Sequence, residues 1–323
     1  MPDIVYEFDP DGDVTFIIKD APESLPHKLS NFNATLLSQL YTNQSNSTKI
    51  SGLPILHIRA SSKHLMLASP HFRGTFRNAF QEGNELRSAG RINIKICDWK
   101  PVPFLILMAV FHGQTQLVPQ SLCFDWLTEM AILVDYYDCY KAVAMVSDLW
   151  TKDFEKKQST LSKRNPMEWL CITWAFRKKD TFESITKYIQ LEYTGEISPD
   201  ELPISARIID TLRTSREIGI GNVIESLYRI LNRLRYGPQM CSFECDLMRL
   251  GALIKGMHEF GILTENPQPR AGYSFMKLRN ACVRMHKAYD SHHCQLMPEV
   301  LKVVNKVHDS LKCGLTLESF LSL

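Results

Sequence analysis

Two cysteines and a histidine-rich cluster have the residue types and spacing of metal ligands. Cys241 and Cys245 lie four residues apart, about one helical turn, and with His258 or with the His292–Cys294 cluster they could bind zinc. Structural zinc sites usually pair two Cys-x-x-Cys elements, which this sequence does not contain, and Cys241 and Cys245 fall in an apolar helical pattern. We therefore expect buried thiols at these two positions, a solvent-exposed turn at 292–294 and no metal.

The patterns that would indicate catalysis or phosphate binding are incomplete. Gly219-Ile-Gly221 has no third glycine at the right place and no preceding strand, so it does not match a dinucleotide-binding loop. Asp135 and Asp138 lie at helical spacing, which is typical of a solvated helix face. A P-loop, a Gly-x-Ser-x-Gly elbow and a His-Glu-x-x-His motif are all missing from the sequence. We expect no catalytic residue and no cofactor, although an active site assembled from distant residues would leave no motif.

Composition and charge indicate an ordinary globular protein. The 323 residues are 45% hydrophobic and 22% charged, and 37 Lys and Arg against 35 Asp and Glu give a net charge of +2. This balance gives no reason to expect binding to nucleic acid or to a membrane. The longest apolar run, Phe104 to Phe111, is far shorter than the ~20 residues that span a bilayer.

The cellular location is predicted from the N-terminal sequence and the cysteines. The first residues are acidic and carry no basic and apolar signal segment. Most of the nine cysteines fall in apolar helical patterns, as reduced thiols do. We expect an intracellular protein of the cytoplasm or nucleus.

The candidate functional residues must be positioned by a small sheet and a group of helices. Alternating apolar residues predict strands at 12–19, 55–60 and 92–96. The polar stretch 22–52 lies between the first two strands and is predicted to be a long loop or insertion. Helical spacing covers 61–80, where Ser69 is a good N-cap before Pro70.

Further helices are predicted at 101–112, 119–136 and 139–154, so the first part of the chain is an α+β domain. We divide the chain into an acidic leader at 1–11, the α+β domain at 12–150, a linker at 151–166 and an all-α region at 167–323.

The α+β part resembles the BTB/POZ domain family. The resemblance rests on the early Asp-Val strand in GDVTFIIKD, on the segment AILVDYYDC that begins at Ala131, and on a helix with the pattern Leu-x-x-x-Ser-x-x-Phe-x-x-x-Phe. Residues Leu65, Ser69, Phe72 and Phe76 match that pattern without a gap. The chain is more specifically similar to a large fungal group of BTB proteins, in which a helical second half carries a segment like WLCITWAF. The resemblance covers 12–150, and the polar stretch 22–52 is longer than the usual link between the first two strands.

Resemblance to BTB domains implies protein–protein interaction. The family commonly self-associates into homodimers, and it commonly serves as an adaptor that binds the cullin scaffold of a ubiquitin ligase while a second domain recruits the substrate. In such adaptors the Ser-x-x-Phe helix and a following triplet of an apolar residue, any residue and Glu contact the cullin. Phe80-Gln81-Glu82 matches that triplet. The implied partner-binding residues are Ser69, Phe72, Phe76, Phe80 and Glu82, with the alternative that the first three belong to the core and to a helix cap.

Two other classes of function stay open at this level. A nuclear BTB-type regulator that recruits co-regulators or binds DNA would be indicated by a zinc-finger array or a strongly basic region, and the sequence has neither. An enzyme would be indicated by a pocket of convergent polar residues, which only a structure can reveal. The helical second half matches only the fungal pattern, which implies no activity.

Overall fold

The computed structural model describes residues 3–19, 21, 25, 54–77, 80–156, 165–263, 273–287 and 298–321. Apart from Leu25, the expected insertion at 22–52 lies outside the described residues. The chain contacts divide into two compact units. The first unit is Met1–Leu161 together with Cys171–Arg177, and the second is Ser162–Leu170 together with Lys178–Leu323.

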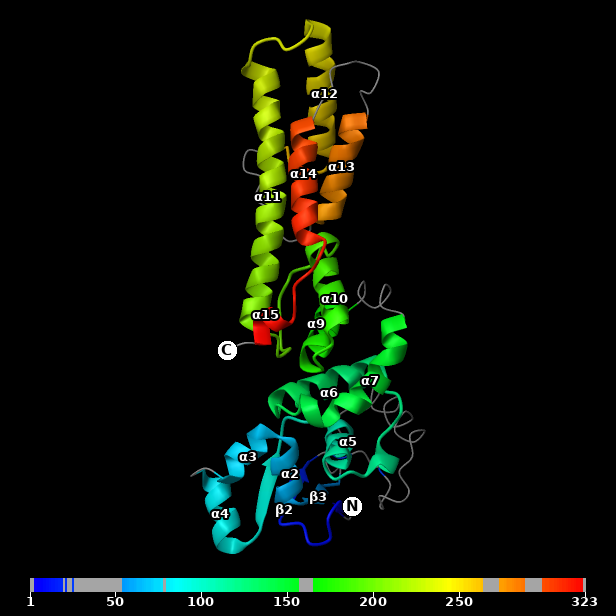
Figure 1. The fold of residues 1–323 in the computed structure, drawn as a ribbon, viewed down its shortest axis with the longest axis vertical. Coiled ribbons are helices and arrows are strands. Elements are labelled where there is room, and N and C mark those ends of the chain that lie inside the picture. The colour runs from blue at the N-terminus through cyan, green and yellow to red at the C-terminus, as the bar shows by residue number, and fades with distance from the viewer. Residues whose placement is uncertain are drawn as a thin grey trace. The chain divides into compact units, whose positions relative to one another are not determined.

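The first unit holds a small sheet and several helices (Figure 1). Its elements in chain order are β1 (Ile4–Glu7), β2 (Val14–Ile18), β3 (Leu56–Ala60), α2 (Ser62–Ala68), α3 (Pro70–Arg77), α4 (Gln81–Ala89), β4 (Ile92–Ile96), α5 (Pro101–Phe111), the 3-10 turn η2 (Thr115–Leu117), α6 (Phe124–Tyr136) and α7 (Tyr140–Lys156). The four strands form a mixed sheet in the order β1-β3-β2-β4. Strand β2 is antiparallel to β3, whereas β1 and β4 run parallel to their neighbours. The α+β architecture predicted from the sequence is therefore confirmed.

One face of the sheet carries the core of the first unit. Residues on β2 and β3 alternate between buried and partly exposed, and the register aligns Phe16 with Ile58 on one side and with Ile94 on the other. Helix α5 is apolar on all sides, and ten of its eleven residues are buried. A helix of this composition must lie inside the unit, because no polar face remains for solvent.

The N-terminal segment is not the loose acidic leader that its charges indicated. Residues Ile4–Glu7 form β1, which pairs with β3 and places Ile4 and Tyr6 in the core. The acidic Glu7 faces outward and pairs with Arg59 of β3. Four residues of alternating pattern were too few to stand out among the surrounding carboxylates, and the strand is held by its neighbour rather than by its own propensity.

A carboxylate from the start of β2 caps helix α2. The two oxygens of Asp13 accept hydrogen bonds from the backbone N–H and the hydroxyl of Ser62, at 2.7 and 2.6 Å. The N-cap residue of α2, Ser61, makes no side-chain cap bond of its own. Asp13 therefore satisfies the first N–H of a helix that begins about fifty residues later in the chain, and it fixes α2 against the sheet.

The helical segment expected at 61–80 is divided into α2 and α3 at Ser69. The Ser69 hydroxyl accepts the N–H of Phe72 at 3.2 Å, and Pro70 occupies the first position of α3, as predicted. The sequence reasoning found no element at 81–91, but α4 covers Gln81–Ala89. Only Gly83 of α4 is buried, so the helix has no apolar stripe that would have indicated it.

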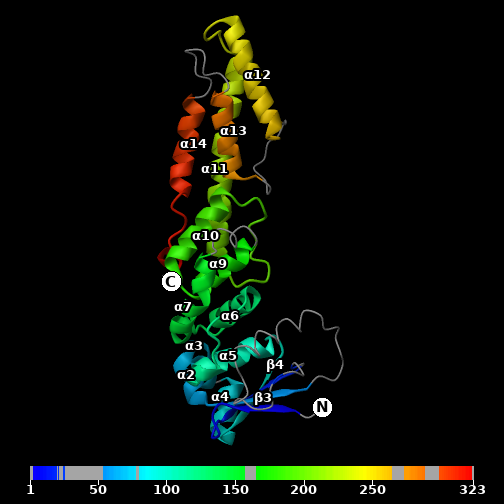
Figure 2. The same cartoon turned by 90° about the vertical axis from the view of Figure 1, so that its right-hand side faces the viewer.

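The second unit is built from helices. Its elements are α9 (Pro166–Ala175), of which the end from Cys171 groups with the first unit, followed by α10 (Lys179–Leu191), α11 (Ala206–Tyr236), α12 (Phe243–Glu259), α13 (Phe275–Lys287), α14 (Pro298–Leu311) and α15 (Glu318–Leu321). The 31-residue helix α11 contacts α10, α12, α13 and α14 around one apolar core (Figures 1 and 2). A side chain at Gly219 would come within 2.8 Å of Val307, so glycine lets α14 approach α11 closely. Gly219-Ile-Gly221 thus lies inside a helix and forms no phosphate loop.

The main division between the units falls after Leu161, inside the linker expected at 151–166. Helix α7 continues to Lys156, and 157–164 lie outside the described residues. Residues 171–177 belong with the first unit because the indole N–H of Trp174 donates to Asp135 at 3.1 Å. The Arg177 guanidinium stacks on the Trp174 ring at 4.3 Å. Asp135 was expected on a solvated face, but it is half-buried, and burial raises the pKa of its carboxyl group.

We expect Asp13→Ala to destabilise the first unit by about 1–3 kcal/mol, because it leaves the N–H and hydroxyl of Ser62 without their partner. Urea unfolding of the full chain measures this loss. Asp11→Ala, at an exposed position in the same turn, is the matched control and should change the free energy of unfolding by less than about 0.5 kcal/mol. Equal effects of the two substitutions would contradict the capping role.

Candidate functional site

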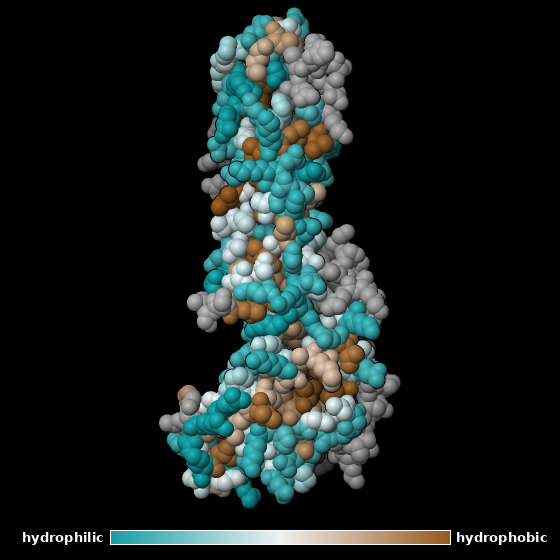
Figure 3. Space-filling view, viewed as in Figure 1, coloured by the Kyte–Doolittle hydropathy of each residue, from teal (hydrophilic) through white to brown (hydrophobic). Residues whose placement is uncertain are grey.

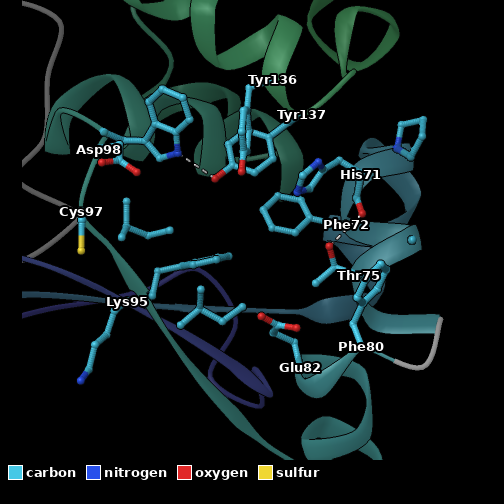
Figure 4. A pocket seen from close by; sticks show the side chains of 16 residues that line it. His71, Phe72, Thr75, Phe80, Glu82, Lys95, Cys97, Asp98, Tyr136 and Tyr137 are labelled. Carbon is cyan, nitrogen blue, oxygen red and sulfur yellow. Dashed lines mark hydrogen bonds between the residues drawn. The ribbon is translucent and has the colours of Figure 1, made fainter.

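A groove of about 620 Å³ opens on the first unit beside strand β4, which is the last strand of the sheet. Its lining comes from β4 and the turn that follows it, from α3 and the start of α4, and from the end of α6. Figure 4 shows side chains from these elements facing one another across the opening. The groove therefore exists only because segments distant in the sequence meet at the sheet edge.

Stacked aromatic rings form the floor of the groove. Phe72 is 4% exposed, and its ring stacks on that of Tyr137 with 4.6 Å between centroids. Phe76 stacks on the other side of Phe72 at 5.8 Å, and Phe16 of β2 contacts Phe72 at the same distance. Offset stacking of this kind adds about 0.5–1.5 kcal/mol per pair to the burial energy, so the floor is rigid.

The rim of the groove combines an exposed aromatic ring with a carboxylate. Phe80, which precedes α4, is 57% exposed, and Glu82 in the first turn of α4 is half-buried. Figure 4 shows the Glu82 carboxylate pointing into the groove and the Lys95 amine pointing away from it. Within the described part of the chain, Glu82 has no hydrogen-bond or ion-pair partner. Glu82 lies in the first turn of α4, and a helix N-terminus favours nearby anions.

The far end of the groove is a polar aromatic cluster. The His71 ring contacts Tyr136 at 4.9 Å, and Trp99 contacts Tyr136 at 5.0 Å. The indole N–H of Trp99 donates to the Tyr137 hydroxyl at 3.0 Å. Burial lowers the pKa of His71, so its imidazole is neutral near pH 7. This end therefore offers ring faces and hydrogen-bonding groups, and the Asp98 carboxylate lies beside Trp99 in the lining.

The structure separates the five residues named from the sequence into two groups. Phe72, Phe80 and Glu82 line the groove together. Ser69 and Phe76 do not line it, and both are buried, at 0% and 3% exposure. The Ser69 hydroxyl donates to the carbonyl of Tyr137 at 2.6 Å while it caps α3, so its role is structural.

Several lining residues were missed by the sequence analysis. His71, Trp99 and Tyr136 lie next to segments that had been singled out, but nothing in their spacing indicated a shared site. Ile94 and Ile96 of β4 were assigned to a strand with an alternating pattern, and both remain partly exposed at the groove. An excess of partly exposed aromatic residues near the Phe72 helix was the available signal.

The chemistry of this arrangement is that of binding. It presents apolar and aromatic surface with two carboxylates, Glu82 and Asp98, and such surfaces bind apolar side chains accompanied by a cation. Among the described residues no three His, Cys, Asp or Glu side chains are grouped as metal ligands would be. Cys245 is a buried thiol on α12, as expected, but Cys241 is exposed, because it precedes α12 and does not share the buried face of that helix. The alternative ligands at 292–294 lie outside the described residues.

No protein-family model, curated protein or solved structure matches this chain. Among the described helices, none combines the length and the apolar composition needed to cross a bilayer. We therefore infer the function from the groove and from the folds of the two units.

We expect Phe72→Ala to cost about 3–5 kcal/mol of stability, because the ring is buried between two aromatic neighbours and its removal leaves a cavity. Phe80→Ala should cost less than about 0.5 kcal/mol, because that ring is largely exposed. Thermal and urea unfolding of both variants measure the difference. A loss of under ~1 kcal/mol in Phe72→Ala would show that the ring is not part of the core.

We expect His71 to make the first unit less stable in mild acid. Its pKa in the folded state lies below the ordinary 6.5, so the unfolded chain binds the proton more readily. Stability is therefore present above about pH 6.5 and decreases as the pH falls below that value towards the folded pKa. His71→Phe should reduce the loss of stability between about pH 7.5 and about pH 5.5. In an NMR titration, a His71 pKa at or above 6.5 would refute this explanation.

Proposed function

We propose that the protein is a non-catalytic protein-interaction module of the BTB/POZ type, with the BTB-like domain at 12–150. In this proposal the groove binds a segment of a partner protein. The observation that carries it is the rim of the groove, where the exposed Phe80 ring lies near the Glu82 carboxylate, which has no partner among the described residues, above an aromatic floor. An interaction protein of this kind acts inside the cell, in the cytoplasm or nucleus.

The arrangement of the motif residues supports the proposal. Leu65, Ser69, Phe72 and Phe76 are each less than 5% exposed, so the spacing that resembles the family is used to build the fold. Asp13 of the early Asp-Val strand caps the helix on which the pattern begins. The Phe-Gln-Glu triplet follows directly and lies at the surface, where a partner can reach it.

The groove can supply binding energy in two ways. Burying the exposed Phe80 ring under a partner contributes about 1.5–3 kcal/mol, reduced by the fraction that is already buried. Glu82 can pair with a Lys or Arg of the partner, and the apolar surroundings strengthen that pair relative to one in open water. The neutral His71 does not compete for the carboxylate.

Within this proposal, the first partner to test is a cullin scaffold. A BTB adaptor binds the cullin with its BTB domain and recruits another protein with a second domain, here the helical second unit. Self-association of the BTB-like domain is the accompanying expectation. If no cullin binds, the proposed function becomes that of a scaffold that binds another protein through the same groove.

We expect the double variant Phe80→Ala with Glu82→Lys to lose cullin binding by at least about a hundredfold, because it removes the apolar contact and reverses the charge. Its unfolding temperature should be nearly unchanged, since neither side chain is in the core. Light scattering of the full chain with and without the cullin measures complex formation.

The matched control is Leu67→Ala with Glu85→Lys, which removes an exposed apolar side chain and reverses an exposed charge outside the groove lining. This control should bind like the unmodified chain. If the unmodified chain binds the cullin and the groove variant binds equally well, the groove is not the cullin site. If the unmodified chain forms no complex, the cullin adaptor role is wrong.

A further inference from the structure

Helix α12 of the second unit carries apolar side chains on its solvent side. Phe243 is 66% exposed, Leu247 50% and Met248 53%. The opposite face of α12 places Cys245, Arg249, Leu253 and Met257 in the interior at four-residue intervals. Because a helix turns once in 3.6 residues, the exposed residues lie together on the other side. Figure 3 shows hydrophobic atoms at the surface of this end of the second unit.

Gly251 continues this row and leaves a notch in it. It is exposed, and a side-chain carbon added there would meet nothing within 4 Å. Glycine is the least favourable residue in a helix interior apart from proline, and no contact within the described chain requires it at this position. We call Phe243, Leu247, Met248 and Gly251 the α12 stripe. A notch of this kind can receive a large side chain of a neighbouring helix.

Two exposed charges of opposite sign lie on the same face of α12 as the stripe. Glu244 lies near the beginning of the helix and Lys255 near its end. Neither side chain has a hydrogen-bond or ion-pair partner among the residues that the structure describes. At 100° per residue, Glu244 and Lys255 lie within about 20° of each other around the helix axis, between Gly251 and Met248.

We propose that the α12 stripe binds the α12 stripe of a second copy of this chain, with the two helices antiparallel. Leu247 lies two residues before Arg249 and Gly251 two residues after it, so a two-fold axis at the level of Arg249 places each Leu247 against the Gly251 of the other copy. The same axis places each Glu244 beside Lys255 of the other copy. Their positions along the helix axis differ by one residue, which is a rise of about 1.5 Å.

The charges select this arrangement over a parallel one. In a parallel two-fold pair, Glu244 would face Glu244 and Lys255 would face Lys255, and like charges at that distance repel. The antiparallel register matches shape and charge together, and two independent features therefore choose the same alignment.

The expected association is weak and depends on concentration. One exposed helix face per copy buries less than the ~1,600 Å² of a standard interface, so we expect a dissociation constant on the order of micromolar. This inference does not use the groove, and it can fail while the proposed function stands. The reverse is also true, because the test substitutions all lie in the second unit.

Sedimentation of the full chain from about 1 to about 100 μM measures the oligomer, over the range in which a micromolar equilibrium shifts. We expect Leu247→Glu to weaken self-association at least about tenfold, because it places a carboxylate in the apolar contact. Ile218→Glu is the matched control, since Ile218 is a 57% exposed apolar residue on α11 outside the stripe. The control should associate like the unmodified chain.

Charge reversal tests the register. Glu244→Lys and Lys255→Glu should each weaken self-association, because each creates two like-charge pairs. An equimolar mixture of these two variants should form a mixed dimer, and the double variant should associate again, because both restore opposite charges across the interface. Neither recovery is expected if the charges affect only the monomer.

Gly251→Leu separates folding from association. Leucine favours the helix and finds open space, so the unfolding temperature of the dilute protein should rise by a few degrees. The same side chain fills the notch, so self-association should weaken about tenfold or more. Circular dichroism checks that every variant is folded.

Three results would overturn the proposal. The first is a chain that stays monomeric up to about 100 μM, which leaves the stripe to a different partner. The second is a dimer that Leu247→Glu does not weaken, which assigns association to another surface. The third is a dimer that Leu247→Glu weakens while the mixed charge variants fail to recover, which excludes the antiparallel register.

Discussion

The hydroxyl of Ser69 joins the two parts of the first unit on which the groove depends. It donates to the carbonyl of Tyr137 after α6 and accepts the N–H of Phe72 in the first turn of α3, with no exposed surface. A buried hydroxyl that uses both functions fixes the direction of both partners, because leaving either unpaired costs about 1–3 kcal/mol. The floor of the groove, the stacked rings of Phe72 and Tyr137, is set by this one group.

The two units show different balances of local and long-range contacts. In the first, short strands are held by neighbours from distant parts of the chain, as β1 is held by β3 and α2 by Asp13. In the second unit, long amphipathic helices bury continuous apolar stripes around α11. This packing requires that neighbouring helices approach one another closely. Each unit leaves some apolar surface exposed: the groove in the first unit and the α12 stripe in the second. We assign the interactions with other proteins to these two surfaces.

Those two surfaces differ in kind. The groove has an aromatic floor and two carboxylates in its described lining, Glu82 and Asp98, which suits a partner that supplies an apolar side chain and a cation. The α12 stripe has a notch at Gly251 and complementary charges, Glu244 and Lys255, on the same helix face, which suits a second copy of itself. Both assignments follow from what the described side chains leave unsatisfied.

The elements whose signals are local could be predicted from the amino-acid sequence alone. Alternation marked β2, β3 and β4, and the Ser69–Pro70 pair marked the start of α3, because capping and fixed proline dihedrals act within one turn. It also singled out Phe80 and Glu82 through a triplet that follows that helix. Three other features depend on long-range contacts: β1 is a strand, α4 is a helix without an apolar face, and Asp135 is half-buried against Trp174. The groove belongs to this second group, because His71, Trp99 and Tyr136 meet across long-range contacts that no spacing in the sequence records.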